Sequence, residues 1–211
     1  MMLYRVARTI VLGLCQLAFR VKVRGTENVP SSGAYIVAPT HRSNLDTPFA
    51  AFVTKRRIRF MAKQELFKHP LGAKLFTALG GVPVERGSPS SRAALKATQA
   101  ALTAGEPVAV FPEGTRRNGR VVDDLFDGTA YLAVKLGVPI VPVGIGGSEE
   151  ILASGKKLPR LRRVAVVVGP PIFPPPGATT RKRSDLAAIT AELQVELQQL
   201  FDDAMAILEQ R

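Results

Sequence analysis

Short apolar runs alternate with amphipathic segments along most of this 211-residue chain. Two of the runs, AYIVAP at 34–39 and PVAVF at 107–111, are typical of strands that are buried on both faces of a mostly parallel sheet. Further strands are predicted at 20–24, 58–63, 81–87, 138–145 and 164–172. Helices are predicted at 48–54, 70–81, 90–103, 127–137 and 185–210. The alternation predicts an α/β fold, a single layered domain with a mostly parallel mixed sheet flanked by helices.

Two details of this pattern bear on local geometry. Asn44 or Asp46 is expected to cap the helix at 48–54, because both residue types accept hydrogen bonds from the first turn of a helix.

Pro139 and Pro142 interrupt the apolar run VPIVPVGI, and proline cannot donate to a strand ladder. We therefore expect this run to be irregular rather than a regular strand.

The first 19 residues predict a separate amphipathic helix, and the remaining domain is expected to span residues 20–211. The apolar stripe of this N-terminal helix has arginines at both ends and consists of Leu3, Val6, Ile10, Leu14 and Leu17. Such a helix can lie in a membrane interface with its arginines at the lipid phosphates, or it can pack on the core of its own domain. The uncharged segment Thr9–Phe19 is too short to span a bilayer. The sequence FRVKVRG that follows does not resemble a signal-peptide cleavage site.

Composition narrows the range of partners. The formal net charge of +12 implies a polyanion, which leaves nucleic acid, an anionic membrane surface, a phosphorylated substrate or an acidic protein. Aromatic residues make up only 6% of the chain, tryptophan is absent, and no zinc-finger spacing occurs, so a nucleic-acid-binding module is disfavoured. A single cysteine, Cys15, and two separated histidines also argue against a metal site and against an intramolecular disulfide.

The segment HRSNLD contains a candidate acid–base pair, His41 and Asp46. Residues five apart on a regular helix point about 140° away from each other, so the pair can form only if His41 precedes the helix that carries Asp46. His41 would then lie at the carboxyl end of the strand at 34–39, where open α/β sheets form their ligand crevices.

The segment FPEGTR follows the strand at 107–111 and should open at the same edge of the sheet. Gly114 permits close backbone approach, Thr115 offers a hydroxyl, and Arg116 can bind a phosphate with two parallel hydrogen bonds. Glu113 is placed to orient that arginine. A third strand end delivers Arg86 to the same region.

Four blocks in this order resemble the glycerolipid acyltransferases of the 1-acylglycerol-3-phosphate acyltransferase type: HRSNLD, GGVPVER, FPEGTR and VPIVPV. The resemblance covers most of the chain. It implies that His41 is the catalytic base, that Asp46 orients it, and that the acceptor phosphate is bound by Arg86, Glu113, Gly114 and Arg116. The stretch FMAKQEL also looks like that family, which makes Lys63 a secondary candidate for substrate binding.

The resemblance further implies transfer of a fatty acyl chain from a thioester donor, acyl-CoA or acyl carrier protein, to a hydroxyl of lysophosphatidic acid. No metal and no other cofactor is expected, and the enzyme would work at the cytoplasmic face of the membrane as a peripheral protein. Glycerol 3-phosphate or another lysophospholipid remains an alternative acceptor. A hydrolase is disfavoured because the chain has no G-x-S-x-G elbow, and GIGGSEE has the wrong spacing.

Overall fold

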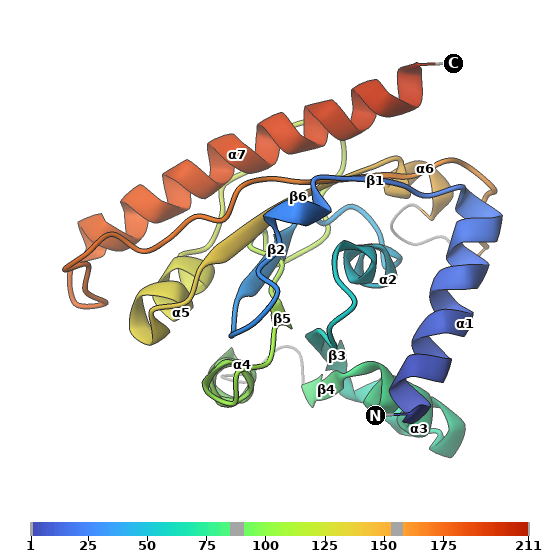
Figure 1. The fold of residues 1–211 in the computed structure, drawn as a ribbon, viewed down its shortest axis with the longest axis horizontal. Coiled ribbons are helices and arrows are strands. Elements are labelled where there is room, and N and C mark those ends of the chain that lie inside the picture. The colour runs from blue at the N-terminus through green and yellow to red at the C-terminus, as the bar shows by residue number, and fades with distance from the viewer. Residues whose placement is uncertain (1, 85–90, 153–157, 211) are drawn as a thin grey trace.

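The computed structural model describes residues 2–84, 91–152 and 158–210 (Figure 1). In these residues one sheet contains seven strands in the order β1-β7-β6-β2-β5-β3-β4. Their bounds are β1 Lys22–Arg24, β2 Ile36–Pro39, β3 Arg59–Lys63, β4 Gly81–Val84, β5 Val108–Ala109, β6 Ile140–Gly146 and β7 Ala165–Val168. All neighbouring strands are parallel except the antiparallel pair β6 and β7. The predicted mostly parallel mixed sheet is confirmed.

Helices cover both faces of the sheet (Figure 1). The helices are α1 Met2–Phe19, α2 Asp46–Ala50, α3 Pro70–Leu79, α4 Ser91–Thr103, α5 Gly128–Leu136, α6 Ser148–Ile151 and α7 Arg183–Glu209. Three short 3-10 segments lie at Thr26–Asn28, Ala51–Val53 and Gln64–Phe67. The core divides between the two faces: α1 and α2 pack on one, and α4, α5 and α7 pack on the other. This is the layered α/β architecture that the sequence predicts.

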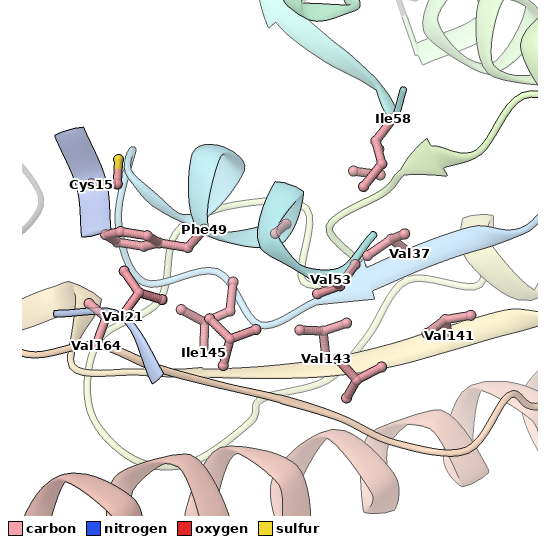
Figure 2. Packing of buried hydrophobic residues seen from close by; sticks show 14 of the residues in the cluster. Cys15, Val21, Val37, Phe49, Val53, Ile58, Val141, Val143, Ile145 and Val164 are labelled. Carbon is pink, nitrogen blue, oxygen red and sulfur yellow. The ribbon is translucent and has the colours of Figure 1, made fainter. Parts of the chain in front are cut away.

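Strand residues alternate between the two halves of the core, as the period of two requires. On β2, Val37 joins the cluster beneath α2, whereas Ile36 and Ala38 join the cluster beneath α7. Figure 2 shows the first cluster, with Val37 and Phe49 among its members. Because β2 is buried on both faces, its position and the direction of the turn that follows it are strongly constrained.

The expectation that the prolines make the run at 138–145 irregular is wrong. β6 is a fully buried strand of seven residues, and Pro142 pairs in register with Ala38 of β2. The Val143 carbonyl faces β2 and accepts from Thr40, whereas the Pro142 carbonyl faces the other side and accepts from Gly169. Since the nitrogen of a strand residue lies on the same side as its own carbonyl, the donor that Pro142 lacks is not needed for pairing with β2.

α7 crosses β6 at very close range, and a glycine makes that approach possible. A Cβ atom on Gly144 would lie 2.2 Å from the Leu200 carbonyl carbon, far inside van der Waals contact. On the N-terminal side of this crossing, α7 buries Leu193 and Leu197 against the sheet. α7 is therefore an integral layer of the domain.

α1 packs on the domain through one face and exposes the predicted apolar stripe on another. Tyr4, Leu12, Cys15 and Phe19 are buried. The stripe residues are 51% to 82% exposed, with Val6 and Leu17 at the two extremes. The sequence offered a membrane interface or the domain's own core as the partner of this stripe, and the core contacts lie on a different face. No helix in the described part of the chain is long and apolar enough to cross a membrane.

Candidate active site

The carboxyl ends of β2 and β5 bring the segments HRSNLD and FPEGTR together. β2 and β5 are adjacent parallel strands, so the residues that follow them leave the sheet at the same edge. The backbone N–H of His41 donates to Glu113 Oε1 at 2.8 Å, and the N–H of Arg117 donates to the His41 carbonyl at 2.9 Å. Two segments that are 72 residues apart in the chain thus form one structure.

Asp46 organises the turn that carries His41. Its Oδ2 atom lies 3.0 Å from His41 Nδ1 and accepts from the backbone N–H groups of Arg42 and Ser43, each at 2.6 Å. The carboxylate is fully buried. Asp46 is the first residue of α2, so His41 precedes the helix that carries it, as the spacing argument required. The predicted cap is wrong, because the Asp46 side chain turns back into this turn and no side-chain hydrogen bond caps α2.

The His41 ring is held on two sides. It stacks on Phe111, with ring centroids 4.0 Å apart and an interplanar angle of 26°, and only 8% of the residue is exposed. Because Asp46 Oδ2 already accepts two backbone hydrogen bonds, Nδ1 of the ring is the donor in the third. Nε2 is then left with its lone pair, which can take a proton from a hydroxyl group.

Glu113 has a different partner from the one predicted. The expectation that it orients Arg116 is wrong, because Glu113 Oε2 pairs with Arg42 Nη1 at 2.5 Å and Oε1 accepts from the His41 N–H. Glu113 is fully buried, so it has no surface to offer a phosphate in this structure. Glu113 therefore holds the backbone of His41 and the side chain of Arg42.

Arg42 is the residue of this site that sequence reasoning missed. Only 1% of Arg42 is exposed, although an arginine in a turn is normally exposed to solvent. Removing one partner from a buried pair such as Arg42–Glu113 typically costs about 3–5 kcal/mol, because the other charge is left uncompensated. Nothing in the local sequence signals this pair, since its two members are 71 residues apart.

The remaining residues of FPEGTR line the same edge. Gly114 has a φ of 67°, which favours glycine, and a Cβ atom there would lie 2.7 Å from the Phe126 ring, which would have to shift. Thr115 is exposed, and Arg116 is half-buried. No carboxylate among the described residues pairs with Arg116, which leaves its guanidinium group available for an anion.

Of the two remaining predicted residues, Lys63 and Arg86, the structure describes only the backbone position of Lys63. Lys63 is the last residue of β3, paired with Val84 of β4, and so belongs to the same edge of the parallel sheet. Arg86 lies outside the described residues. Within those residues there is no cluster of three or more His, Cys, Asp or Glu side chains that could hold a metal ion.

An apolar cavity of about 330 Å³ lies next to the turn His41–Asp46. Asn44 and Leu45, from the turn itself, form part of its wall. Most of the rest comes from α1, α2, β3 and α3, with Val11, Phe60, Leu75 and Phe76 among the lining residues. A hydrocarbon chain fits such an environment, because apolar walls compensate the transfer of methylene groups out of water.

The sequence and the fold match known proteins. The chain is 27% identical to the 1-acyl-sn-glycerol-3-phosphate acyltransferase of Bacillus subtilis (strain 168), over 94% of this chain and 96% of that protein. It is 30% identical to the chloroplastic 1-acyl-sn-glycerol-3-phosphate acyltransferase LPAT1 of Arabidopsis thaliana, over 66% of this chain and 39% of that protein.

Among solved structures, the 1-acyl-sn-glycerophosphate (LPA) acyltransferase PlsC from Thermotoga maritima is similar, with a TM-score of 0.77 and 26% identity. The match covers 93% of this chain and 79% of that one. Residues 20–146 match the acyltransferase family. The resemblance indicated by the four sequence blocks is confirmed, and the chain belongs to the acyltransferase family, with relatives of the lysophosphatidic acid acyltransferase type in phospholipid biosynthesis.

Proposed function

We propose that this acyltransferase moves a fatty acyl chain from a thioester donor to the free hydroxyl of lysophosphatidic acid and so forms phosphatidic acid. The observation that carries the proposal is the pairing of His41 with Asp46 beside the FPEGTR segment. The acceptor named by the relatives, a 1-acylglycerol phosphate, supports the same choice.

In the proposed reaction His41 Nε2 takes the hydroxyl proton while the hydroxyl oxygen attacks the thioester carbonyl. The tetrahedral intermediate then expels the thiolate, which receives the proton back from His41 and leaves as a free thiol. Asp46 stabilises the imidazolium that forms between the two steps. A thiol with a pKa of about 8.5 is a good leaving group, so the reaction needs no protein nucleophile.

We assign the acceptor phosphate to the arginines at the sheet edge. Arg116 has no carboxylate partner among the described residues and lies between Glu113 and Arg117, which both form hydrogen bonds with the His41 backbone. Arg86 is the second candidate, on the basis of its place in the GGVPVER block, and Lys63 is a third. Gly114 and Thr115 would shape this binding loop, whereas Glu113 acts from beneath it.

The apolar cavity is assigned to an acyl chain. It adjoins the catalytic turn at Asn44 and Leu45 and reaches α3, where Leu75 is 44% exposed. A chain in this cavity would place its head group near His41. The donor is acyl-CoA or acyl carrier protein, which share the thioester on which the mechanism acts.

The proposal also places the protein on an anionic membrane surface, at its cytoplasmic face. The exposed stripe of α1 supplies the apolar contact, and the excess of positive charge favours anionic lipid. A membrane-bound position would bring the enzyme to a substrate that itself resides in the bilayer.

Acceptor choice tests the proposal. The purified protein is given labelled palmitoyl-CoA with lysophosphatidic acid, glycerol 3-phosphate or lysophosphatidylcholine in parallel, and the products are identified by mass. Phosphatidic acid as the main product supports the proposal. Preferred acylation of glycerol 3-phosphate or lysophosphatidylcholine overturns the acceptor assignment, and release of free fatty acid without an acylated product would indicate a hydrolase.

A further inference from the structure

Arg42 is the largest side chain with less than 2% exposure in the part of the chain that the structure describes. A buried arginine is costly unless its donors are satisfied, and here they are used thoroughly. Nη1 donates to Glu113 Oε2 and to the His41 carbonyl, Nε donates to the Gly119 carbonyl at 3.1 Å, and Nη2 donates to the Val121 carbonyl at 2.9 Å. The guanidinium group also lies over the Phe201 ring of α7, 5.1 Å from its centroid.

These contacts connect three parts of the molecule whose relative positions the proposed reaction depends on. The first is the catalytic turn, through the His41 carbonyl. The second is Glu113, which in turn accepts from the His41 N–H. The third is the segment 119–121, which continues the chain a few residues beyond Arg116. The Arg42 side chain therefore forms hydrogen bonds both with the turn that contains His41, the proposed base, and with the loop that contains Arg116, the proposed phosphate-binding residue.

The loop is fixed from its other side by α7. Gln198 accepts from the Val122 N–H at 2.8 Å and donates to the Arg120 carbonyl at 3.0 Å, and Gln194 donates to the Val122 carbonyl. α7 is itself anchored to the sheet through Gly144 and its buried leucines. The Arg42 side chain ties this anchored loop to the turn His41–Asp46 at Gly119 and Val121, and the Arg117 N–H adds a further tie to the His41 carbonyl.

We propose that Arg42 is a positioning residue that, together with Glu113, sets the orientation of His41 relative to the phosphate-binding loop. The two residues act through other groups, because Glu113 is fully buried with both carboxylate oxygens bonded and Arg42 directs its guanidinium toward backbone carbonyls and Glu113. The kinetic part of this inference rests on the proposed function.

The test compares single and paired substitutions. Arg42→Met alone leaves a buried carboxylate unpaired and is expected to unfold easily, so the informative variant is Arg42→Met with Glu113→Gln. That pair removes both charges and keeps an amide oxygen that can accept from the His41 N–H. The matched control is Arg59→Met with Glu106→Gln, which removes an ion pair of 2.8 Å that lies outside the site.

Two readouts are measured on folded protein, checked by thermal unfolding. The first is the kinetics of acyl transfer: we expect kcat of the Arg42–Glu113 double variant to fall about 10- to 100-fold, with a rise in KM for lysophosphatidic acid. The control is expected to keep the wild-type values. A folded double variant with wild-type kcat and KM would overturn the inference.

The second readout does not depend on turnover. The ¹⁵N chemical shifts of the His41 ring report which nitrogen carries the proton, and His69→Gln assigns the signals because the chain has only two histidines. We expect the Nδ1–H form in the wild type and in the control, and a shifted ring signal in the Arg42–Glu113 double variant, because a displaced turn changes the contacts of the ring with Asp46 and Phe111. Inactivity of the wild type toward every acceptor would sink the proposed function alone, whereas an unchanged ring signal in the double variant would overturn the positioning role.

Discussion

His41 and Asp46 meet through a single carboxylate oxygen, Asp46 Oδ2, which lies 3.0 Å from His41 Nδ1. The same oxygen accepts from the backbone N–H groups of Arg42 and Ser43, so the ring and the turn that carries it are fixed by one buried atom. The orientation of the proposed base and the conformation of its turn are therefore not independent.

Replacing Asp46 with asparagine should separate binding from chemistry. The amide can keep the backbone hydrogen bonds of the turn, but it cannot stabilise an imidazolium as a carboxylate does. We expect kcat to fall by about 10²- to 10⁴-fold in Asp46→Asn, with little change in KM for the acceptor. Steady-state kinetics measure both constants, and a variant that retains wild-type kcat would remove Asp46 from the mechanism.

Arg116 should contribute to acceptor binding through its charge. In Arg116→Gln we expect KM for lysophosphatidic acid to rise at least about tenfold, which corresponds to roughly 1.4 kcal/mol of lost binding. Arg120→Gln is the control, because Arg120 already pairs with Glu209 on the surface. Equal changes in the two variants would indicate a general effect of net charge rather than a phosphate site.

A side chain on Gly114 should displace the neighbouring Phe126 ring. The Gly114 φ of 67° strains any other residue, and a Cβ atom would also press on the Phe126 ring. Gly105 has a similar φ of 78° but open space around it, so it isolates the backbone effect. We expect Gly105→Ala to destabilise the fold by about 1–2 kcal/mol and Gly114→Ala to lose activity in addition. Denaturant unfolding and kcat/KM, measured on both variants, distinguish the two effects, and equal activity would contradict the packing argument.

The stripe of α1 should govern binding to lipid. Ile10→Glu with Leu14→Glu changes two residues that are 57% and 62% exposed, so the fold should persist. Burying one such side chain gains up to about 1.5–3 kcal/mol, and we expect binding to anionic vesicles to weaken at least about tenfold. Vesicle co-sedimentation measures this.

The matched control for the stripe is Val195→Glu on α7, a residue that is 71% exposed. It should leave vesicle binding nearly unchanged after allowance for one added negative charge. If the control weakens binding as much as the stripe variant does, the apolar face of α1 is not the contact surface.

The fold was predictable because the apolar runs at 34–39 and 107–111 are too short for helices and have the length and composition of central strands. The HRSNLD geometry was predictable as well, because only a turn before α2 allows His41 to reach Asp46. The long-range pairing was not predictable. The sequence favours the nearby Arg116 as the partner of Glu113, whereas in the fold the buried Glu113 pairs with Arg42. The regular pairing of Pro142 was not predictable, because a single sequence does not say on which side of a strand each backbone N–H group is needed.

In the proposed mechanism, His41 is the base of an acyl transfer to lysophosphatidic acid. The most direct measurement is the initial rate of phosphatidic acid formation from labelled palmitoyl-CoA by the wild type and by His41→Ala, with circular dichroism and thermal unfolding recorded on both. We expect a folded variant whose rate is lower by about 10²- to 10⁴-fold. A folded His41→Ala protein that forms phosphatidic acid at the wild-type rate would contradict the account.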